Sequence, residues 1–275
     1  KSDDPDSYNS KTPLQKIAIL LAGPFANFLL AFIIYLSVAF SNPQTLAPHI
    51  GTLLENSPAV EAGLLKDDKI IAMNSEAITT WKRLTEVIKD TTGDIDLIIQ
   101  RNNEQLNILV KPRILESENI FGEMVQRRMF GITPNGDMVD THYGVIESFS
   151  IAAEQTYNSS KLIVQSLEKL ISGIVGIDQI GGVISIVDTT AKASEYGVIA
   201  FFMFAALLSV NLGVLNLLPI PALDGGHIMF NLYEMITRHT PSDAAFIRIT
   251  IMGWVMLGSL MLLGIYNDIN RLIAG

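Results

Sequence analysis

Three long apolar runs constrain the fold of this chain more than any other feature. Residues 17–40 contain no charged side chain, and two further apolar runs cover residues 197–218 and 249–266. At about 1.5 Å rise per residue, a helix over any of these runs crosses most or all of the roughly 30 Å hydrocarbon core of a bilayer. Composition agrees, because 49% of the 275 residues are hydrophobic and only 17% are charged. The sequence therefore predicts an α-helical membrane protein, with the lipid bilayer as its surroundings.

The charges indicate orientation and exclude some partners. Lys1, Lys11 and Lys16 precede the first run, and Arg238 and Arg248 lie between the second and third. By the positive-inside rule, both regions are cytoplasmic and the large region between the first two runs is extracytoplasmic. The net charge of −9 argues against a nucleic-acid partner, and the absence of cysteine leaves His, Asp and Glu as the strong metal ligands.

The region between the first two spans has the pattern of a water-soluble α+β domain. A short helix is expected after Thr79 or Thr80, and residues 95–100 and 106–111 are expected strands joined at Asn102-Asn103. The pattern Ser57-Pro58-Ala59 to Ile70 resembles the SPAxxAGLxxGDxI signature of a bacterial PDZ domain, with Asp67 and later Ser75 where that family usually has glycine. The resemblance implies a PDZ domain over residues 46–115, followed by a linker over 116–144. A generic α+β domain is the alternative.

The rest of the chain is expected to be helical. Between residues 145 and 171 the apolar side chains recur every three or four positions, which predicts an amphipathic helix that either lies on the membrane surface or packs beneath the PDZ domain. The other expected segments are a cytoplasmic segment (residues 1–16), a first span (17–41) and an interfacial helical region (145–192). They are followed by a second span with its cytoplasmic loop (195–246) and a last span with its tail (247–275).

Polar residues and prolines are concentrated where the second span ends. Asn211 and Asn216 lie inside the apolar run, and Asp224 follows it at a depth where a carboxylate costs about 2.5 to 3.5 kcal/mol. Pro219 and Pro221 cannot continue a helix, so irregular backbone is expected between them and Asp224. Each residue also has a structural explanation, since Asp commonly caps helices and Asn commonly forms hydrogen bonds between packed helices. His227 is better explained as an interfacial residue than as a ligand.

Taken together, these residues form a specific motif. The match to NxxPxPxLDGG is complete, and it resembles the third-transmembrane-helix motif of the site-2 protease family of intramembrane zinc metalloproteases, in particular its bacterial RseP-type branch; the matching residues are Asn216, Pro219, Pro221, Leu223, Asp224, Gly225 and Gly226. Three further segments support the resemblance: residues 23–27 are similar to the family's GPxxN element, and residues 182–186 and 266–272 are similar to two other segments of that branch.

The resemblance implies a zinc site shared with a segment outside this sequence. In the family, an H-E-x-x-H helix supplies two histidine ligands and a general-base glutamate, and Asp224 would be the third zinc ligand. No histidine of this chain is followed four residues later by another. We therefore expect a fourth span upstream, and we expect these residues alone to be inactive. Asn216 is the expected catalytic residue, and the substrate-binding residues would be Asn211, Asn216, Pro219 and Pro221.

The implied function is intramembrane proteolysis. The enzyme would be a zinc endopeptidase of the bacterial inner membrane that cleaves single-span membrane proteins of the anti-sigma-factor type, with the PDZ domain outside the cytoplasm restricting access. One alternative is a non-catalytic membrane anchor whose PDZ domain binds peptides. A transporter is another, because broken helices with polar groups at membrane depth also occur there.

Overall fold

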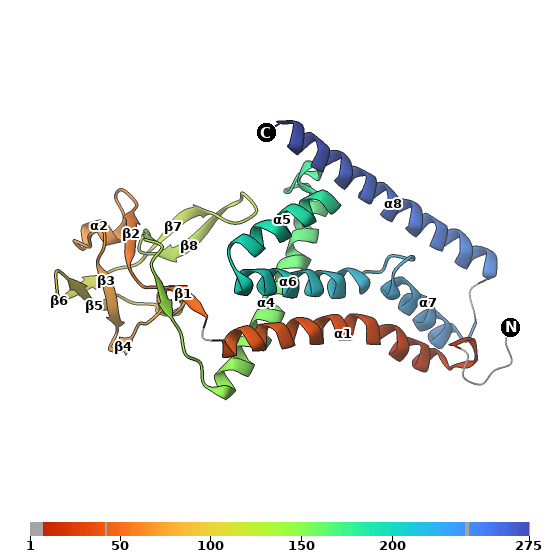
Figure 1. Cartoon of the computed structure of the whole chain (residues 1–275), viewed down its shortest axis with the longest axis horizontal. Coiled ribbons are helices and arrows are strands. Elements are labelled where there is room, and N and C mark those ends of the chain that lie inside the picture. Colours follow the sequence, from red (N-terminus) through yellow and green to blue (C-terminus); the bar gives the residue numbers. More distant parts are fainter. Residues whose placement is uncertain (1–7, 42, 240–241, 275) are drawn as a thin grey trace. The chain divides into compact units, whose positions relative to one another are not determined.

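The computed structural model describes residues 8–41, 43–239 and 242–274, which form two compact units (Figure 1). The helical unit is the described part of Lys1–Ser41 and Tyr143–Gly275, and the β-rich unit is the described part of Asn42–His142.

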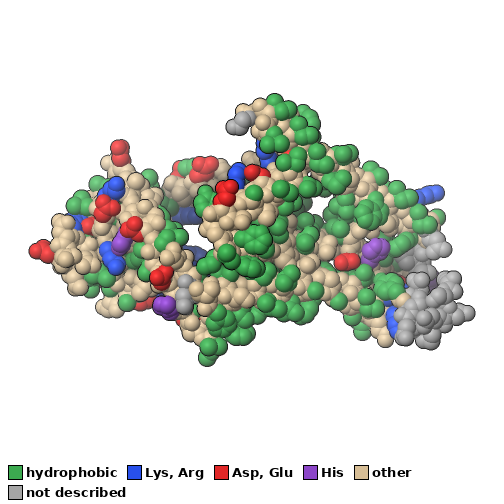
Figure 2. Space-filling model, viewed as in Figure 1, with side chains coloured by type: hydrophobic (Ala, Val, Ile, Leu, Met, Phe, Trp, Pro, Cys, Tyr) green, Lys and Arg blue, Asp and Glu red, His purple; other side chains and the backbone are tan. Residues whose placement is uncertain are grey.

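The helical unit consists of six α-helices and two short 3₁₀ turns among its described residues. They are η1 (Tyr8–Ser10), α1 (Pro13–Phe40), α4 (Val145–Ile171), η2 (Ile177–Gln179), α5 (Val183–Glu195), α6 (Val198–Asn216), α7 (Asp224–Thr237) and α8 (Asp243–Ala274). Three of them are long and apolar enough to cross a membrane, over Pro13–Phe40, Val198–Asn216 and Ala244–Ala274. Hydrophobic side chains cover much of the visible face of this unit (Figure 2), as expected of helices in contact with lipid. The prediction of three spans in these residues is confirmed, and the protein is a multi-pass membrane protein.

Helix α1 is the centre of the helical unit. Thr12 and Gln15 form a capping box at its start, and Pro13 occupies the first turn, where a missing N–H costs nothing. The helix packs against α4, α6 and α7, and much of its contact with α4 and α6 is made by small or β-branched side chains that allow close approach, namely Ala31, Ala152, Ala206, Val210 and Val214.

Helix α4 covers the residues for which an amphipathic helix was predicted. It packs against α1 and α6 within the helical unit. The hydroxyls of Tyr35 and Ser159 form a 2.9 Å hydrogen bond between α1 and α4, and the ring of Phe149 lies 6.1 Å from that of Phe32. We expected this helix to lie on the membrane surface or beneath the inserted domain, and neither expectation included its packing against the spans α1 and α6.

The β-rich unit is built from short antiparallel strands and two helices. Its elements are β1 (Gln44–Leu46), β2 (Ile50–Leu53), α2 (Pro58–Glu61), β3 (Lys69–Met73), β4 (Glu76–Ala77), α3 (Trp81–Asp90), β5 (Ile95–Arg101), β6 (Glu104–Val110), β7 (Arg113–Glu118), β8 (Met124–Met129), β9 (Ile132–Pro134) and β10 (Met138–Asp140). The largest sheet has the strand order β4-β3-β5-β6, and the pairs β1-β10, β2-β9 and β7-β8 form separate two-stranded ladders.

Local sequence signals predicted several of these elements correctly. Thr80 caps α3 through a hydrogen bond from the Arg83 N–H. Asn102 and Asn103 both adopt positive φ, 51° and 68°, in the two-residue turn between β5 and β6, which is the geometry that asparagine favours in tight hairpins.

The prediction that residues 116–144 form a linker is corrected by the structure. Most of these residues belong to the β-rich unit and contain the end of β7 and all of β8, β9 and β10. Strands β9 and β10 pair with β2 and β1, at the other end of the unit's sequence, and Phe130 is fully buried in its core. Local sequence gives no signal for such pairing, because the partner strands are far apart along the chain.

A buried ion pair holds the loop before β3. Asp68 is only 1% exposed, and its carboxylate accepts hydrogen bonds from the Leu65 N–H and from Nε and Nη2 of Arg101, at 2.7 to 2.8 Å. The same guanidinium donates to the Gly63 carbonyl. Asp67, which stands where the resembling signature has glycine, adopts φ of 67°, a conformation that Asp tolerates better than most residues.

Candidate functional site

The motif at the end of α6 forms a break between two helices. Helix α6 ends at Asn216, residues 217–223 are irregular, and α7 begins at Asp224. The break follows from Pro219 and Pro221, which lack the N–H that a helix requires. Leu223 occupies the N-cap position of α7, so Asp224 lies in the first turn of that helix and is not its N-cap residue. The prediction of irregular backbone before Asp224 is confirmed.

Gly225 and Gly226 let the irregular segment fold back onto the first turn of α7. A Cβ at Gly226 would lie 2.2 Å from the Ile220 carbonyl oxygen and 2.5 Å from the Pro221 Cα, and one at Gly225 would lie 2.3 Å from the Leu218 carbonyl oxygen. The chain's own preceding residues therefore occupy the space beside both glycines.

Asp224 lies against the first span. A Cβ built on Gly23 would be 3.3 Å from Oδ2 of Asp224, so the carboxylate contacts α1 where α1 has no side chain. One turn further along α1, the Asn27 carbonyl accepts a 2.9 Å hydrogen bond from the hydroxyl of Ser209 in α6. The structure thus brings the Gly23–Asn27 element beside the motif that contains Asp224.

The other predicted site residues lie along the same break. Asn211 and Asn216 are half-buried in the last two turns of α6, Pro221 is half-buried and Pro219 is exposed. Among the described residues, the side chains of Asn211, Asn216 and Asp224 accept or donate no hydrogen bond. His227, one turn after Asp224, lies in an aromatic cluster, with its ring 5.6 Å from Phe246 and 6.4 Å from Phe230.

The donors in the described part of the chain account for only part of a metal site. A protein zinc site generally takes at least three His, Cys, Asp or Glu ligands, and no group of three or more such side chains that could hold a metal ion occurs among the described residues. Asp224 is therefore not part of a complete group of zinc ligands within the described residues.

Sequence reasoning singled out residues 182–186 and 266–272 but did not predict that they meet in a polar cluster near the end of α8. Asp268 is 2% exposed and Asn267 is 6% exposed, and both form hydrogen bonds with the segment that contains η2 and the start of α5. The available signal was a carboxylate next to an amide at the end of an apolar run, but their partners lie more than 80 residues earlier in the sequence.

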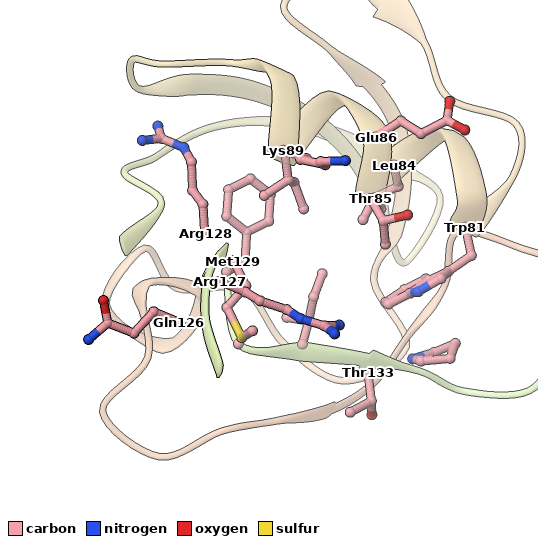
Figure 3. Close-up of a pocket in the computed structure, with 15 residues that line it drawn as sticks. Trp81, Leu84, Thr85, Glu86, Lys89, Gln126, Arg127, Arg128, Met129 and Thr133 are labelled. Carbon is pink, nitrogen blue, oxygen red and sulfur yellow. The ribbon is translucent and has the colours of Figure 1, made fainter. Parts of the chain in front are cut away.

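The β-rich unit contains a cavity of about 720 Å³. It lies between α3 and the segment from β8 to β9, with Trp81, Leu84 and Thr85 on the helix side and Arg127, Met129 and Thr133 on the strand side (Figure 3). Its lining is mostly apolar, with Lys89, Arg127 and Arg128 as basic groups.

Comparison with known proteins gives a consistent family. The profile of peptidase family M50 matches residues 1–260. A protein of Campylobacter jejuni named as a zinc metalloprotease is 40% identical over 98% of this chain and 73% of its own length. One of Helicobacter pylori with the same kind of name is 37% identical over 98% of this chain and 77% of its length. The regulator of sigma-W protease RasP of Bacillus subtilis is 33% identical over 96% of this chain and 61% of its length.

The family match covers both the motif with Asp224 and the Gly23–Asn27 element that lies against it. Because the matching proteins are named as zinc metalloproteases, the metal implied for this family is zinc. The chain therefore belongs to peptidase family M50, and it is a zinc metalloprotease.

Proposed function

We propose that this protease cleaves transmembrane segments of single-span membrane proteins, and that Asp224 is one of its zinc ligands. The observation that carries the proposal is the position of Asp224. It lies at a helix break next to a membrane-spanning helix, with its carboxylate against the bare backbone of Gly23. A carboxylate at membrane depth is expensive to retain unless it binds something.

The roles of the neighbouring residues follow from their chemistry. Zinc, when bound, polarises a peptide carbonyl and activates water for hydrolysis. Asn216 is the last residue of α6 and is separated from Asp224 by the irregular residues 217–223. Its amide is proposed to orient the substrate backbone or to donate a hydrogen bond to the developing oxyanion. Such an interaction is worth about 3 kcal/mol in other enzymes. Asn211 is proposed to contact the substrate one to two helical turns earlier.

Pro219 and Pro221 are proposed to bind an unwound substrate. A helix hides its peptide groups, so a transmembrane substrate has to be extended before it is cut. Neither proline has an N–H, so each offers only its carbonyl oxygen to a substrate strand. Pairing of the extended substrate with the irregular segment that contains these prolines would place the scissile peptide close to Asp224.

The β-rich unit is proposed to be a PDZ domain on the extracytoplasmic side. Support comes from the order of its elements and from the groove between α3 and β9, which has the size of a ligand cavity. It is inserted between α1 and α4, and its proposed role is to exclude substrates that have bulky outer domains. The proposed location is the bacterial inner membrane, and the proposed substrates are membrane-anchored regulators, the class suggested by the name of the B. subtilis relative.

Metal removal tests the catalytic proposal. When the full-length protein is treated with a chelator, cleavage of a single-span model substrate is expected to stop, and stoichiometric zinc should restore it, because the metal supplies several kcal/mol of transition-state stabilisation. Product formation is followed on gels. Peptide binding to the β-rich unit serves as the control and should not change. Cleavage that continues after zinc has been removed, as measured by metal analysis, would contradict the proposal, because it would show that proteolysis does not depend on the metal.

Deletion of the β-rich unit tests whether this unit excludes substrates that have bulky outer domains. With residues 43–142 replaced by a short flexible linker, we expect hydrolysis of small substrates to continue and substrates with bulky outer domains to be cleaved as well. The measurement is the ratio of cleavage rates for one transmembrane segment with and without a folded outer domain. If the protein without the β-rich unit is folded and binds zinc but cleaves neither substrate, the unit is required for cleavage itself and the proposed role as a size filter is wrong.

A further inference from the structure

A cluster at the end of α8 joins two segments that the catalytic proposal does not use. The Asp268 carboxylate accepts hydrogen bonds from the Gly182 N–H and the Ser185 N–H at 3.0 Å, and from the Ser185 hydroxyl. These donors form the first turn of α5, whose unpaired N–H groups and positive dipole end favour an anion. Asp268 is 2% exposed, so its buried carboxylate is stabilised by hydrogen bonds from another element, with Arg271 of its own helix 4.0 Å away.

Neighbouring residues extend the same contact. The Asn267 amide donates to the carbonyls of Ile177 and Ile180, at 2.8 and 3.0 Å. Arg271 donates to the Asp178 carbonyl at 2.7 Å. The backbones also touch, because a Cβ at Gly182 would lie 2.7 Å from the Gly264 carbonyl carbon. We call this set of contacts the latch; it comprises Asn267, Asp268 and Arg271 on α8 and residues 177–185 opposite them.

A second close contact of α8 is with the irregular segment before Asp224. A Cβ at Gly253 would lie 2.8 Å from the Ala222 nitrogen and 3.3 Å from the Pro221 carbonyl carbon, so the backbone of α8 rests directly on this segment. Most large apolar side chains of α8 are exposed, including Trp254, Val255, Met261 and Leu262. In the described part of the chain, α8 is held by the latch, by its contact at Gly253 and, near its start, by the ring of Phe246, which lies 5.6 Å from His227 and 5.0 Å from Phe230 of α7.

The latch is also connected, through α5, to helix α6, which contains Asn211 and Asn216. Helix α5 leads through Gly197 into α6, at whose end Asn211 and Asn216 lie. The segment from α5 through α6, the irregular residues and α7 to α8 is thus closed into a loop by the latch. A change at the latch can shift the irregular segment from both directions.

We propose that Asp268 is a positioning residue for proteolysis, which acts by holding α8 against Ala222 and so fixes the irregular segment beside Asp224. The proposal rests on the proposed function of that segment. Displacement of reacting groups by about 1 Å can cost about a hundredfold in rate, so release of the latch is expected to lower kcat and to leave zinc binding unchanged.

The first experiment compares two variants of the full-length protease. Asp268→Ala is expected to lower kcat about tenfold to a hundredfold with little change in KM and with zinc content equal to that of the parent. The matched control is Asp188→Ala, because Asp188 lies on α5, the helix whose first turn Asp268 binds, but is itself exposed and pairs with Lys192 across one turn; it should retain parental activity. Full activity of Asp268→Ala, or loss of zinc in proportion to activity, would overturn the proposal.

A disulfide distinguishes positioning from simple loss of folding. The chain contains no cysteine, so Ser185→Cys combined with Asp268→Cys introduces one defined pair where the two side chains now touch. We expect the oxidised pair, verified by loss of thiol labelling, to restore kcat to within about threefold of the parent and reduction to lower it again. Equal activity of the oxidised and reduced forms would overturn the proposal. Its failure is separable from failure of the zinc assignment, because the latter is read from the metal content and activity of Asp224 variants.

Discussion

Asp224→Asn is expected to abolish proteolysis by the full-length enzyme, with a fall in kcat of about a thousandfold or more. Asparagine has nearly the same shape as aspartate, and Asp224 lies in the first turn of α7 without being its N-cap residue. A purely structural role would therefore lose only the interaction of the charge with the helix dipole, about 0.3 to 1 kcal/mol, and the enzyme would survive the change. A metal ligand would not, because the amide lacks the charge of the carboxylate. The contact with Gly23 leaves room for either side chain, since no side chain of α1 opposes it.

The measurements for this variant are substrate cleavage and zinc content. We expect both to fall, while thermal unfolding in detergent remains close to that of the parent. Asp188→Asn is the control, because it makes the same chemical change at an exposed position of α5. Full activity with full zinc stoichiometry in Asp224→Asn would show that the carboxylate is not a ligand and would remove the main support for the catalytic assignment.

Gly226→Ala is expected to reduce proteolysis by about a hundredfold, because it displaces the segment that would bind the substrate. The added Cβ would meet the Ile220 carbonyl oxygen at 2.2 Å and the Pro221 Cα at 2.5 Å, and both are backbone atoms that cannot rotate away. Alanine otherwise favours a helix over glycine by about 1 kcal/mol. Any loss therefore comes from the contact with the irregular segment and not from helix propensity.

The control for this change is Gly258→Ala. Gly258 lies in the middle of α8 with nothing within 4 Å of an added Cβ, so the same substitution should leave activity unchanged and slightly increase helix stability. The measurements are kcat for a single-span substrate and the unfolding temperature of both variants. Parental activity of Gly226→Ala would mean that the position of residues 217–223 is not important for catalysis.

Several features of the fold were predictable because they depend on residues close together in sequence. The apolar runs specify spans by length and hydropathy alone. The capping threonine before α3 and the two asparagines between β5 and β6 act through their own backbone neighbours. The break after Asn216 follows from Pro219 and Pro221, whichever helices surround it.

Other features were not predictable from local pattern. The strands β9 and β10 were expected to be part of a linker, and their pairing with β2 and β1 depends on partners far along the chain. The glycines after Asp224 were recognised as part of the motif, but only the structure shows that the preceding segment is the neighbour that requires them.

The sequence by itself determined that this chain crosses a membrane, where its helices break, and that its motif residues are those of the site-2 protease family. These properties follow from hydropathy, proline chemistry and side-chain identity, which each residue carries with it. Only the tertiary structure decided that Asp224 lies against Gly23 and that Asp268 holds the start of α5. The physical reason is that these contacts join surfaces far apart in sequence, and their geometry depends on how whole helices pack, which local periodicity leaves open.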